Sequence, residues 1–324
     1  MSDTKYTYAV AQIRAMELGL LSQGDIDQLI GCKTDDQCLQ MLQEKGWGGN
    51  DVPLEAEAIL ACERQKAWSV VRDLVKDDPT VLDVLSLPDL FHNLKAAVKL
   101  ACSREENEQM FVPDCAISGA DMLEWLGRKD YDAFPANMRA AAQEAYETLL
   151  HTGDGQLCDV IVDRAALEAI RQAGLQASDE MIRDYAESTV AIADIRIAAR
   201  CLKTGKSRDF MLRAMAPCDA FTPEALATAV LGGMQSFCDY LAGVGYGEAG
   251  QALQQSASWF ECWCDNRMME TIEPQKRNPF TVGPLVAYLL GRENEIKTVR
   301  IILTGKRNSL PEDQIRERVR KMYG

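Results

Sequence analysis

One pattern recurs three times along this 324-residue chain at a constant offset of 101 residues, and it limits the folds that the chain can adopt. The matching segments are NLKAAVKLACSR from Asn93, DIRIAARCLKTGK from Asp194 and EIKTVRIILTGK from Glu295. Each continues with an aliphatic residue, a cation and further apolar residues at the spacing of one helix face. The apolar stripes consist of Leu94, Ala97 and Ala101, of Ile195, Ala198 and Leu202, and of Ile296, Val299 and Leu303. We therefore predict three copies of one helical unit, near residues 1–115, 116–216 and 217–324.

The rest of the chain also carries helical patterns. Apolar residues recur every three or four positions in segments such as YAVAQIRAMELGLL and LEAEAILACERQKAWSVVRDLV, and no sustained period-two strand pattern is present. Three helix starts are marked by capping pairs or by proline at the first helical position. These are Ser22 with Asp25, Ser118 with Asp121, and Thr222 before Pro223. The sequence predicts an all-α protein.

Charge and composition exclude several classes of protein. A formal net charge of −14 argues against a nucleic-acid binder, because a phosphate backbone would be repelled by the chain as a whole. The chain has no run of about 18 apolar residues, so the sequence predicts no membrane span. The N-terminal residues also lack the apolar core of a signal peptide. The eleven cysteines do not resemble a small secreted disulfide framework. We interpret most of them, including Cys62, Cys201 and Cys238, as reduced, buried residues of a cytosolic protein.

The C-terminal end differs from the acidic body. From Lys297 onward the chain has eight Lys and Arg residues against three Asp and Glu, a net charge of +5. In PEDQIRERVRKMYG, Ile315, Val319 and Met322 form an apolar stripe at helical spacing. We predict a docked terminal helix with a solvated basic face. A contact of the basic face with a partner or a membrane surface is the alternative.

The residues that usually carry catalysis or metal binding are sparse. The two histidines, His92 and His151, are far apart in the sequence, and ECWCD places two cysteines on different helix faces with no matching pair elsewhere. TGKS at 204–207 resembles the end of a phosphate-binding loop, but Arg200 stands where that loop needs glycine and a helix precedes it. Gly205 is better interpreted as a helix-ending glycine. We predict no catalytic, metal, cofactor or nucleotide site.

Both ends of the chain resemble the C-subunit family of V-type ATP synthases and ATPases, whose eukaryotic counterparts are called d subunits. The resemblance is carried by YAVAQIRAMELGLLSQGDIDQL, by DIRIAARCLKTGK and by FTVGPLVAYLLGRENEIKTVRIILTGKRNSLPEDQIRERVRKMYG. The most specific residues are Glu293, Glu295, Ile296, Lys297 and Arg300. The chain departs from the family at Thr298, where asparagine is usual, and the middle third matches less sharply.

The resemblance implies an all-helical protein of three similar domains, arranged as a funnel around a pseudo-threefold axis. It implies a non-catalytic component without cofactors that lies on the cytoplasmic face of the membrane. One end would sit on the membrane rotor ring and the hollow end would receive the shaft, which is formed by the D and F subunits. Such a socket would couple ATP hydrolysis or synthesis to proton or sodium transport, and the sequence leaves both the ion and the direction open.

Within this picture, six residues are candidates for structural or interface roles. We expect Lys95, Arg196 and Lys297 to set how each domain meets the next or to line the funnel, or else to be ordinary solvated cations. The pair Glu293–Lys297 has i,i+4 spacing and is most simply a helix-stabilising contact. Glu295 and Arg300 complete the set. A generic cytosolic helical-repeat scaffold is the alternative function, although such scaffolds have shorter repeats of about 34–47 residues. A carboxylate enzyme in a helical bundle would need clustered Glu and His, which this sequence lacks.

Overall fold

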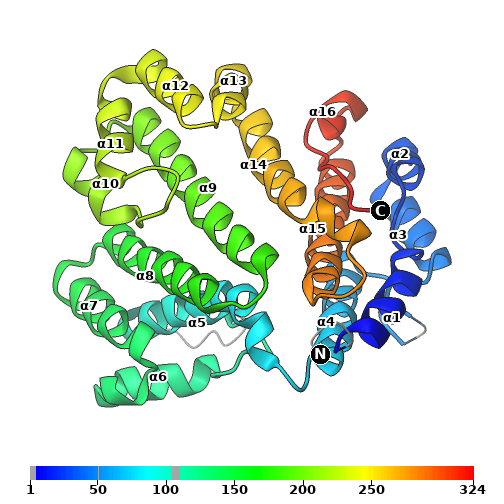
Figure 1. Cartoon of the computed structure of the whole chain (residues 1–324), viewed down its shortest axis with the longest axis horizontal. Helices are drawn as coiled ribbons and strands as arrows, with labels where there is room; N and C mark the ends of the chain where they lie inside the picture. Colours follow the sequence, from blue (N-terminus) through cyan, green and yellow to red (C-terminus); the bar gives the residue numbers. More distant parts are fainter. Residues whose placement is uncertain (1–4, 50, 104–109) are drawn as a thin grey trace. The chain divides into compact units, whose positions relative to one another are not determined.

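The computed structural model describes residues 5–49, 51–103 and 110–324, and over these residues it contains helices and no strand (Figure 1). The all-α prediction is confirmed. Arg104, at the end of the first repeated segment, lies outside the described residues. The chain divides into two compact units. Unit 1 consists of Met1–Val81, Asp179–Ile182 and Glu248–Gly324, and unit 2 consists of Leu82–Ser178 and Arg183–Gly247. The three-part division of the sequence stays a prediction.

Unit 1 combines the two ends of the chain. Its N-terminal helices are α1 (Thr7–Glu17), α2 (Gln23–Gly31), α3 (Asp35–Glu44) and α4 (Ala56–Leu74). Its C-terminal helices are α14 (Ala257–Ile272), α15 (Gly283–Arg307) and α16 (Glu312–Arg316), with a 3-10 turn η4 at Glu273–Arg277. The short helix α13 (Gly247–Gln255) leads into α14, and the 3-10 turn η1 (Pro79–Leu82) ends the N-terminal part.

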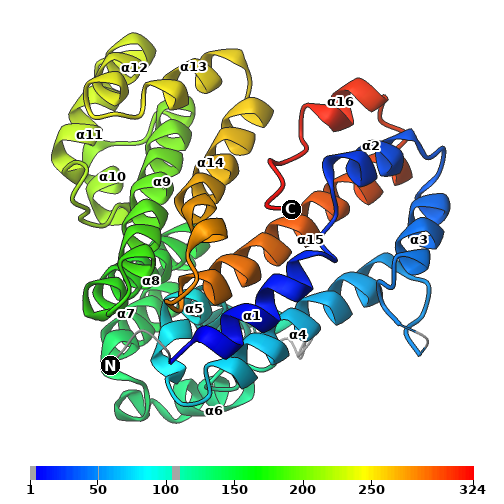
Figure 2. The ribbon, with the colours of Figure 1, turned by 45° about the vertical axis from the view of Figure 1, so that its right-hand side comes forward.

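Helix α15 is the centre of unit 1, and α1, α3, α4 and α14 all pack against it (Figure 2). It is buried on most of its circumference, including the stripe residues Ile296, Val299 and Leu303. Ile296 and Val299 join the apolar residues of α2, α3 and α4 in one core cluster. Most polar residues of this core helix are paired with other side chains. The helix therefore combines buried aliphatic residues with polar residues that bind neighbouring helices, and its later turns expose one face that carries Lys297, Arg300, Thr304 and Arg307.

The C-terminal tail is docked, but most of it is not helical, so the predicted terminal helix is wrong beyond Arg316. Side chains of α14 and α15 bind the backbone of the tail and replace the hydrogen bonds that a helix would make. Cys262 Sγ donates to Val319 O, Asn266 Oδ1 accepts from Lys321 N at 2.7 Å, and Asn294 Nδ2 donates to Lys321 O at 2.9 Å. The basic face is also only partly solvated, because Arg320 is buried in an ion pair with Asp265.

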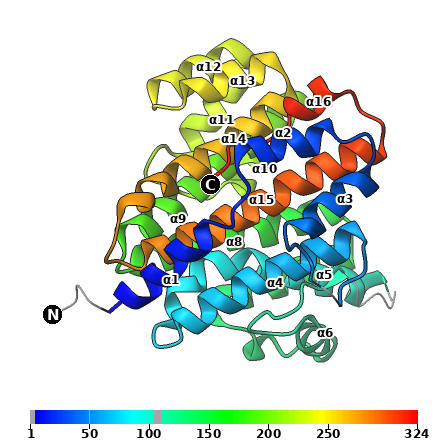
Figure 3. The same ribbon diagram turned by 90° about the vertical axis from the view of Figure 1, so that its right-hand side faces the viewer.

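Two glycines of α15 make room for this tail. A Cβ atom at Gly305 would lie 2.8 Å from Ile315 Cγ1, and one at Gly291 would lie 2.9 Å from Tyr323 Cδ1. Ile315, on α16, is fully buried beside α15 and joins the core cluster of unit 1. Figure 3 shows α16 next to α2, with which it also packs.

Replacing Ile315 with alanine is expected to lower the free energy of unfolding by about 2–5 kcal/mol, because it removes a buried aliphatic side chain and leaves a cavity. Urea unfolding followed by circular dichroism measures the change. Leu231→Ala is the control, because Leu231 is 58% exposed and its truncation removes little buried surface. Equal stability of the two variants would contradict the docked position of the tail.

Unit 2 is built around α5 (Asp83–Ser103), against which α6 (Gly119–Arg128), α7 (Ala136–Thr152) and α8 (Gly155–Gln176) pack. A 3-10 turn, η3, covers Tyr131–Ala133. The long helix α9 (Glu180–Thr204) lies in unit 2 from Arg183 onward. It is followed by α10 (Arg208–Ala214), α11 (Pro223–Leu231) and α12 (Gly233–Gly243). The stripe residues Leu94, Ala97, Ile195 and Ala198 are fully buried, as predicted for core-facing positions.

The predicted helix starts are confirmed. Ser22 and Asp25 form a complete capping box, the Ser118 side chain accepts from the backbone of Asp121, and Thr222 caps α11 with Pro223 at its first position. Gly205 has a φ of +62° and ends α9, as predicted for a helix-terminating glycine.

Candidate functional site

Three buried polar side chains occupy the first positions of the three repeated segments. Asn93 and Asp194 are fully buried and Glu295 is 1% exposed. Each accepts a hydrogen bond from a backbone N–H of a separate connecting segment: Asn93 Oδ1 from Val112 at 2.7 Å, Asp194 Oδ1 from Ala216 at 3.1 Å, and Glu295 Oε1 from Leu21. The residues 101 apart therefore have the same physical role, which is to attach a connecting segment to a long core helix.

Among these three residues, only Glu295 was a candidate on the sequence alone. Asn93 and Asp194 are visible as the polar residues that open otherwise apolar repeats, so their common spacing was a signal that could have found them. A polar side chain at the start of a buried stripe needs a partner, and the nearest donors are the unpaired backbone groups of a neighbouring loop.

In unit 1, Glu295 belongs to a buried ion network that joins α15 to α4. Arg292 binds both Glu295 and Glu63, and the three side chains are at most 8% exposed. Glu63 Oε1 also accepts from Gly48 N at 2.8 Å, and the Arg292 guanidinium lies 4.9 Å from the Trp47 ring centroid. Burial raises the pKa of Glu295, and the Arg292 charge opposes that shift. The network ties α15, α4 and the segment before α4 together.

The other candidate residues of α15 also reach neighbouring segments. Glu293 Oε1 accepts from Arg64 Nε at 2.8 Å and from Trp68 Nε1 at 2.7 Å, both on α4. Lys297 Nζ lies 2.6 Å from Asp265 Oδ2 on α14, and Arg300 makes an exposed pair with Glu57 at 2.9 Å.

The i,i+4 spacing of Glu293 and Lys297 was therefore misleading. Their charges point to different helices, because α4 and α14 both pack against α15 and each offers one of them a partner. Thr298, where the family usually has asparagine, is fully buried and its Oγ1 has no hydrogen-bond partner among the described residues.

In unit 2, Lys95 of α5 forms an ion pair with Asp163 of α8, and Lys99 pairs with Asp159 at 2.7 Å. Lys99 follows Lys95 on α5, whereas its partner Asp159 precedes Asp163 on α8. The two helices therefore run antiparallel, with ion pairs at successive turns. Arg196 is half-buried on α9. The role of Lys95, Arg196 and Lys297 in joining domains or lining a funnel stays a prediction.

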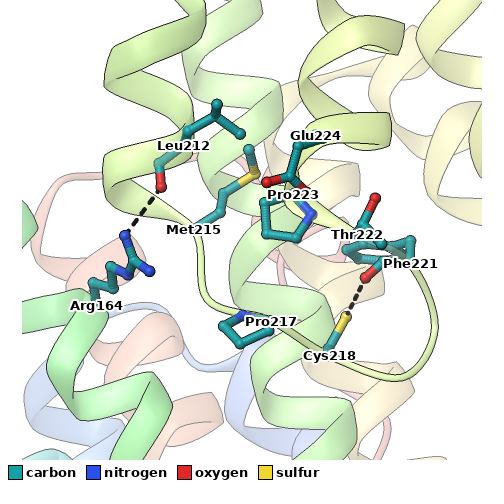
Figure 4. Close-up of a pocket in the computed structure, with 9 residues that line it drawn as sticks. All are labelled: Arg164, Leu212, Met215, Pro217, Cys218, Phe221, Thr222, Pro223 and Glu224. Atoms are coloured by element: carbon teal, nitrogen blue, oxygen red, sulfur yellow. Dashed lines mark hydrogen bonds between the residues drawn. The ribbon is translucent and has the colours of Figure 1, made fainter.

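The remaining features offer no chemistry that fits catalysis. Within the described residues, no three His, Cys, Asp or Glu side chains are grouped so that they could hold a metal ion. Lys206 of the TGKS segment binds Gln156 Oε1 at 2.7 Å and lies over the Phe210 ring. A hollow of about 250 Å³ in unit 2 is lined by Arg164, Cys218, Glu224 and apolar neighbours (Figure 4). Its thiol, Cys218, donates to the Phe221 carbonyl, and burial raises the pKa of Cys218 to about 11, so it is not a thiolate nucleophile at neutral pH.

This arrangement defines a helical protein whose buried polar side chains fix helices and connecting segments to one another. The model of the ATP synthase (C/AC39) subunit family matches residues 9–318, so the chain belongs to that family. Its members are non-catalytic components of V-type and A-type ATPases. Where the chain is described, no helix combines the length and low charge needed to cross a bilayer.

Curated relatives agree with this assignment. The chain is 24% identical to the C subunit of the V-type sodium ATPase of Enterococcus hirae, over 96% of this chain and 97% of the relative. It is 19% identical to the C subunit of the A-type ATP synthase of Methanocaldococcus jannaschii, over 96% and 85% of the two chains. The corresponding Halorubrum lacusprofundi protein is 30% identical over 53% of this chain and 52% of its own length.

Proposed function

We propose that the chain is the socket of the central stalk in a V-type or A-type ATPase, linking the D and F subunits of the shaft to the membrane rotor ring. It would lie on the cytoplasmic face of the membrane and couple ATP hydrolysis or synthesis to proton or sodium transport. The observation that carries the proposal is the family match along nearly the whole chain, together with relatives covered over most of their length.

The packing of the chain supports a component that transmits force. Close-packed cores resist deformation, and each unit adds ion pairs that cross between helices. Net attraction in such pairs is small, but a buried network such as Arg292 with Glu63 and Glu295 can fix the register of the helices that it joins. A socket between two turning components needs this kind of fixed shape.

We further propose three similar domains at residues 1–115, 116–216 and 217–324, arranged as a funnel around a pseudo-threefold axis. The three buried acceptors support this division, because Asn93, Asp194 and Glu295 are 101 residues apart and each binds a backbone N–H of a connecting segment. Glu295 of the proposed third domain accepts from the backbone of Leu21, which belongs to the proposed first domain. This contact would join the third domain to the first.

Two kinds of contact surface fit the two proposed neighbours. Exposed apolar side chains stand at the C-terminal ends of helices in both units, among them Leu18, Leu150 and Leu231. Such residues suit a contact with the rotor ring. The contact with the shaft would use exposed charged groups, for which candidates include Arg300 and Glu57.

Co-purification tests this proposal. An affinity-tagged chain, extracted from membranes in mild detergent, is expected to bring down the proteins of the rotor ring and the shaft. Raising the salt concentration should release the shaft proteins before the ring, because exposed charges are screened beyond about 8–10 Å near physiological ionic strength. Recovery of the chain with neither ring nor shaft proteins would contradict the proposal.

A further inference from the structure

Asp194 holds the position in α9 that Asn93 holds in α5 and Glu295 in α15, but it lacks the second partner that each of those residues has. The Asn93 amide both accepts from Val112 N and donates to Val112 O at 2.9 Å. Glu295 is neutralised by Arg292. Asp194 is fully buried, and its Oδ2 has no hydrogen-bond partner among the described residues.

The charged and titratable groups around Asp194 do not supply the missing cation. Arg164, on α8, directs Nε to Glu168 at 2.9 Å and Nη1 to the Leu212 carbonyl at 3.2 Å. Glu187, on α9 itself, adds a negative charge and accepts from the backbone of Asp219 and Ala220. Cys218 stays a neutral thiol, because burial raises its pKa to about 11. A lone carboxylate in this place would be a buried charge without a partner, which is very costly.

We propose that Asp194 is an uncharged carboxylic acid in the folded chain at neutral pH, and that loss of its proton to solvent at alkaline pH loosens the 215–222 connection from α9. A protonated carboxyl has one acceptor oxygen and one O–H donor, the same pair that the amide of asparagine offers. It can therefore keep the Ala216 N–H bond through Oδ1 while Oδ2 carries a proton, in place of the amide donor that Asn93 directs to Val112 O.

The segment held in this way joins two helices of unit 2. Residues 215–222 run from the end of α10 to the cap of α11, and Met215 and Pro217, on either side of Ala216, line the hollow drawn in Figure 4. Met215 and Ala216 are themselves fully buried. Loss of the Asp194 proton would leave a buried negative charge beside this segment, so the folded state would favour openings that admit water.

The direction of the pH dependence follows from the burial. Desolvation raises the pKa of Asp194 to about 8 in the folded chain, whereas an unfolded aspartate keeps a pKa of about 3.9. The folded state therefore holds this proton more tightly than the unfolded state does. The stabilising contribution is complete below about pH 4 and is lost as the pH rises through the folded-state value near 8.

The direct test is a titration of the full-length chain labelled with 13C at the aspartate side-chain carboxyls and followed by NMR. We expect one carboxyl signal with a midpoint near pH 8 that is absent from Asp194→Asn. Hydrogen exchange at the Ala216 amide should quicken across the same pH range beyond the rise seen for other buried amides. If every aspartate signal titrates below about pH 5, the proposal is wrong, and this measurement needs only the unaltered chain.

Two variants test the consequence for stability. Asp194→Asn keeps an acceptor for the Ala216 N–H without a titrating group, and Asp209→Asn is the matched control at an exposed position of α10. The unfolding equilibrium constant of the unaltered chain, relative to Asp194→Asn, should rise with pH by up to about tenfold per unit and level off above about pH 8. Asp209→Asn should show no such trend. Asn93→Asp should add a second buried carboxyl group that titrates at alkaline pH. A constant ratio between the unaltered chain and Asp194→Asn from about pH 5 to 9 would overturn the proposal.

Discussion

Replacing Arg292 with methionine is expected to lower the free energy of unfolding by about 3–5 kcal/mol at pH 7, the cost of leaving the buried Glu295 carboxylate without its cation, whereas Glu63 keeps its ion pair with Lys66. Arg292 is the shared partner of Glu63 and Glu295, and all three side chains are almost completely buried. The substitution removes the charge and keeps most of the aliphatic length, so the loss reports the charge network rather than a cavity. Urea unfolding measured by tryptophan fluorescence is a suitable readout, because Trp47 lies against Arg292 and Trp68 binds Glu293, the next residue of α15.

The matched control is Arg300→Met on the same helix. Arg300 and Glu57 form an ion pair whose side chains are 52% and 75% exposed, and exposed pairs contribute about 0–1 kcal/mol. The destabilisation by Arg292→Met should also shrink at acid pH, because burial raises the pKa of Glu295 and its carboxyl, once protonated, no longer needs the cation. If both variants lose the same small amount at pH 7, the buried network does not hold unit 1 together.

The local features of the fold could be predicted from the sequence. The helical stripes and the caps at Ser22, Ser118 and Thr222 depend on residues within one or two turns, and the structure has them where the sequence places them. The polar contacts that hold the core could not be predicted in this way. Glu293 binds Arg64 and Trp68, which are 229 and 225 residues away, so its i,i+4 neighbour Lys297 was the wrong partner.

The tail shows the same limit. Ile315, Val319 and Met322 have helical spacing, and all three do pack on the core of unit 1. The helix nevertheless ends at Arg316, because Cys262, Asn266 and Asn294 bind the backbone of the following residues. Amphipathic spacing reports which side chains are buried, but it does not report which side chains from elsewhere compete for the backbone. For Asp194, the only sequence signal of its burial is its place at the start of a repeat, because most aspartates among the described residues are exposed.

The second large effect concerns the whole complex. We expect an ATPase assembled without this chain to keep ATP hydrolysis in its soluble catalytic head and to lose ion pumping. The reason is mechanical: in the proposed role, the chain contributes to the complex through its contacts with the shaft and the ring. Without a socket, the shaft would turn with no firm connection to the ring.

Single substitutions refine this expectation. Arg292→Met should reduce pumping per ATP hydrolysed only at temperatures where the variant begins to unfold, whereas Arg300→Met should reduce this ratio with little change in stability if Arg300 contacts the shaft as proposed. An effect of Arg300→Met on pumping without a change in stability would place that residue at a contact, which is where the family resemblance makes it a candidate.

The most direct measurement is reconstitution of the rotor ring, stator and catalytic head in vesicles, with and without this chain, while ATP hydrolysis and ion uptake are recorded side by side. We predict that hydrolysis persists in both samples and that ion uptake requires the chain. Adding the purified chain back should restore uptake without raising the hydrolysis rate of the isolated head. Full ion pumping in its absence, or loss of hydrolysis by the isolated head, would contradict a coupling role.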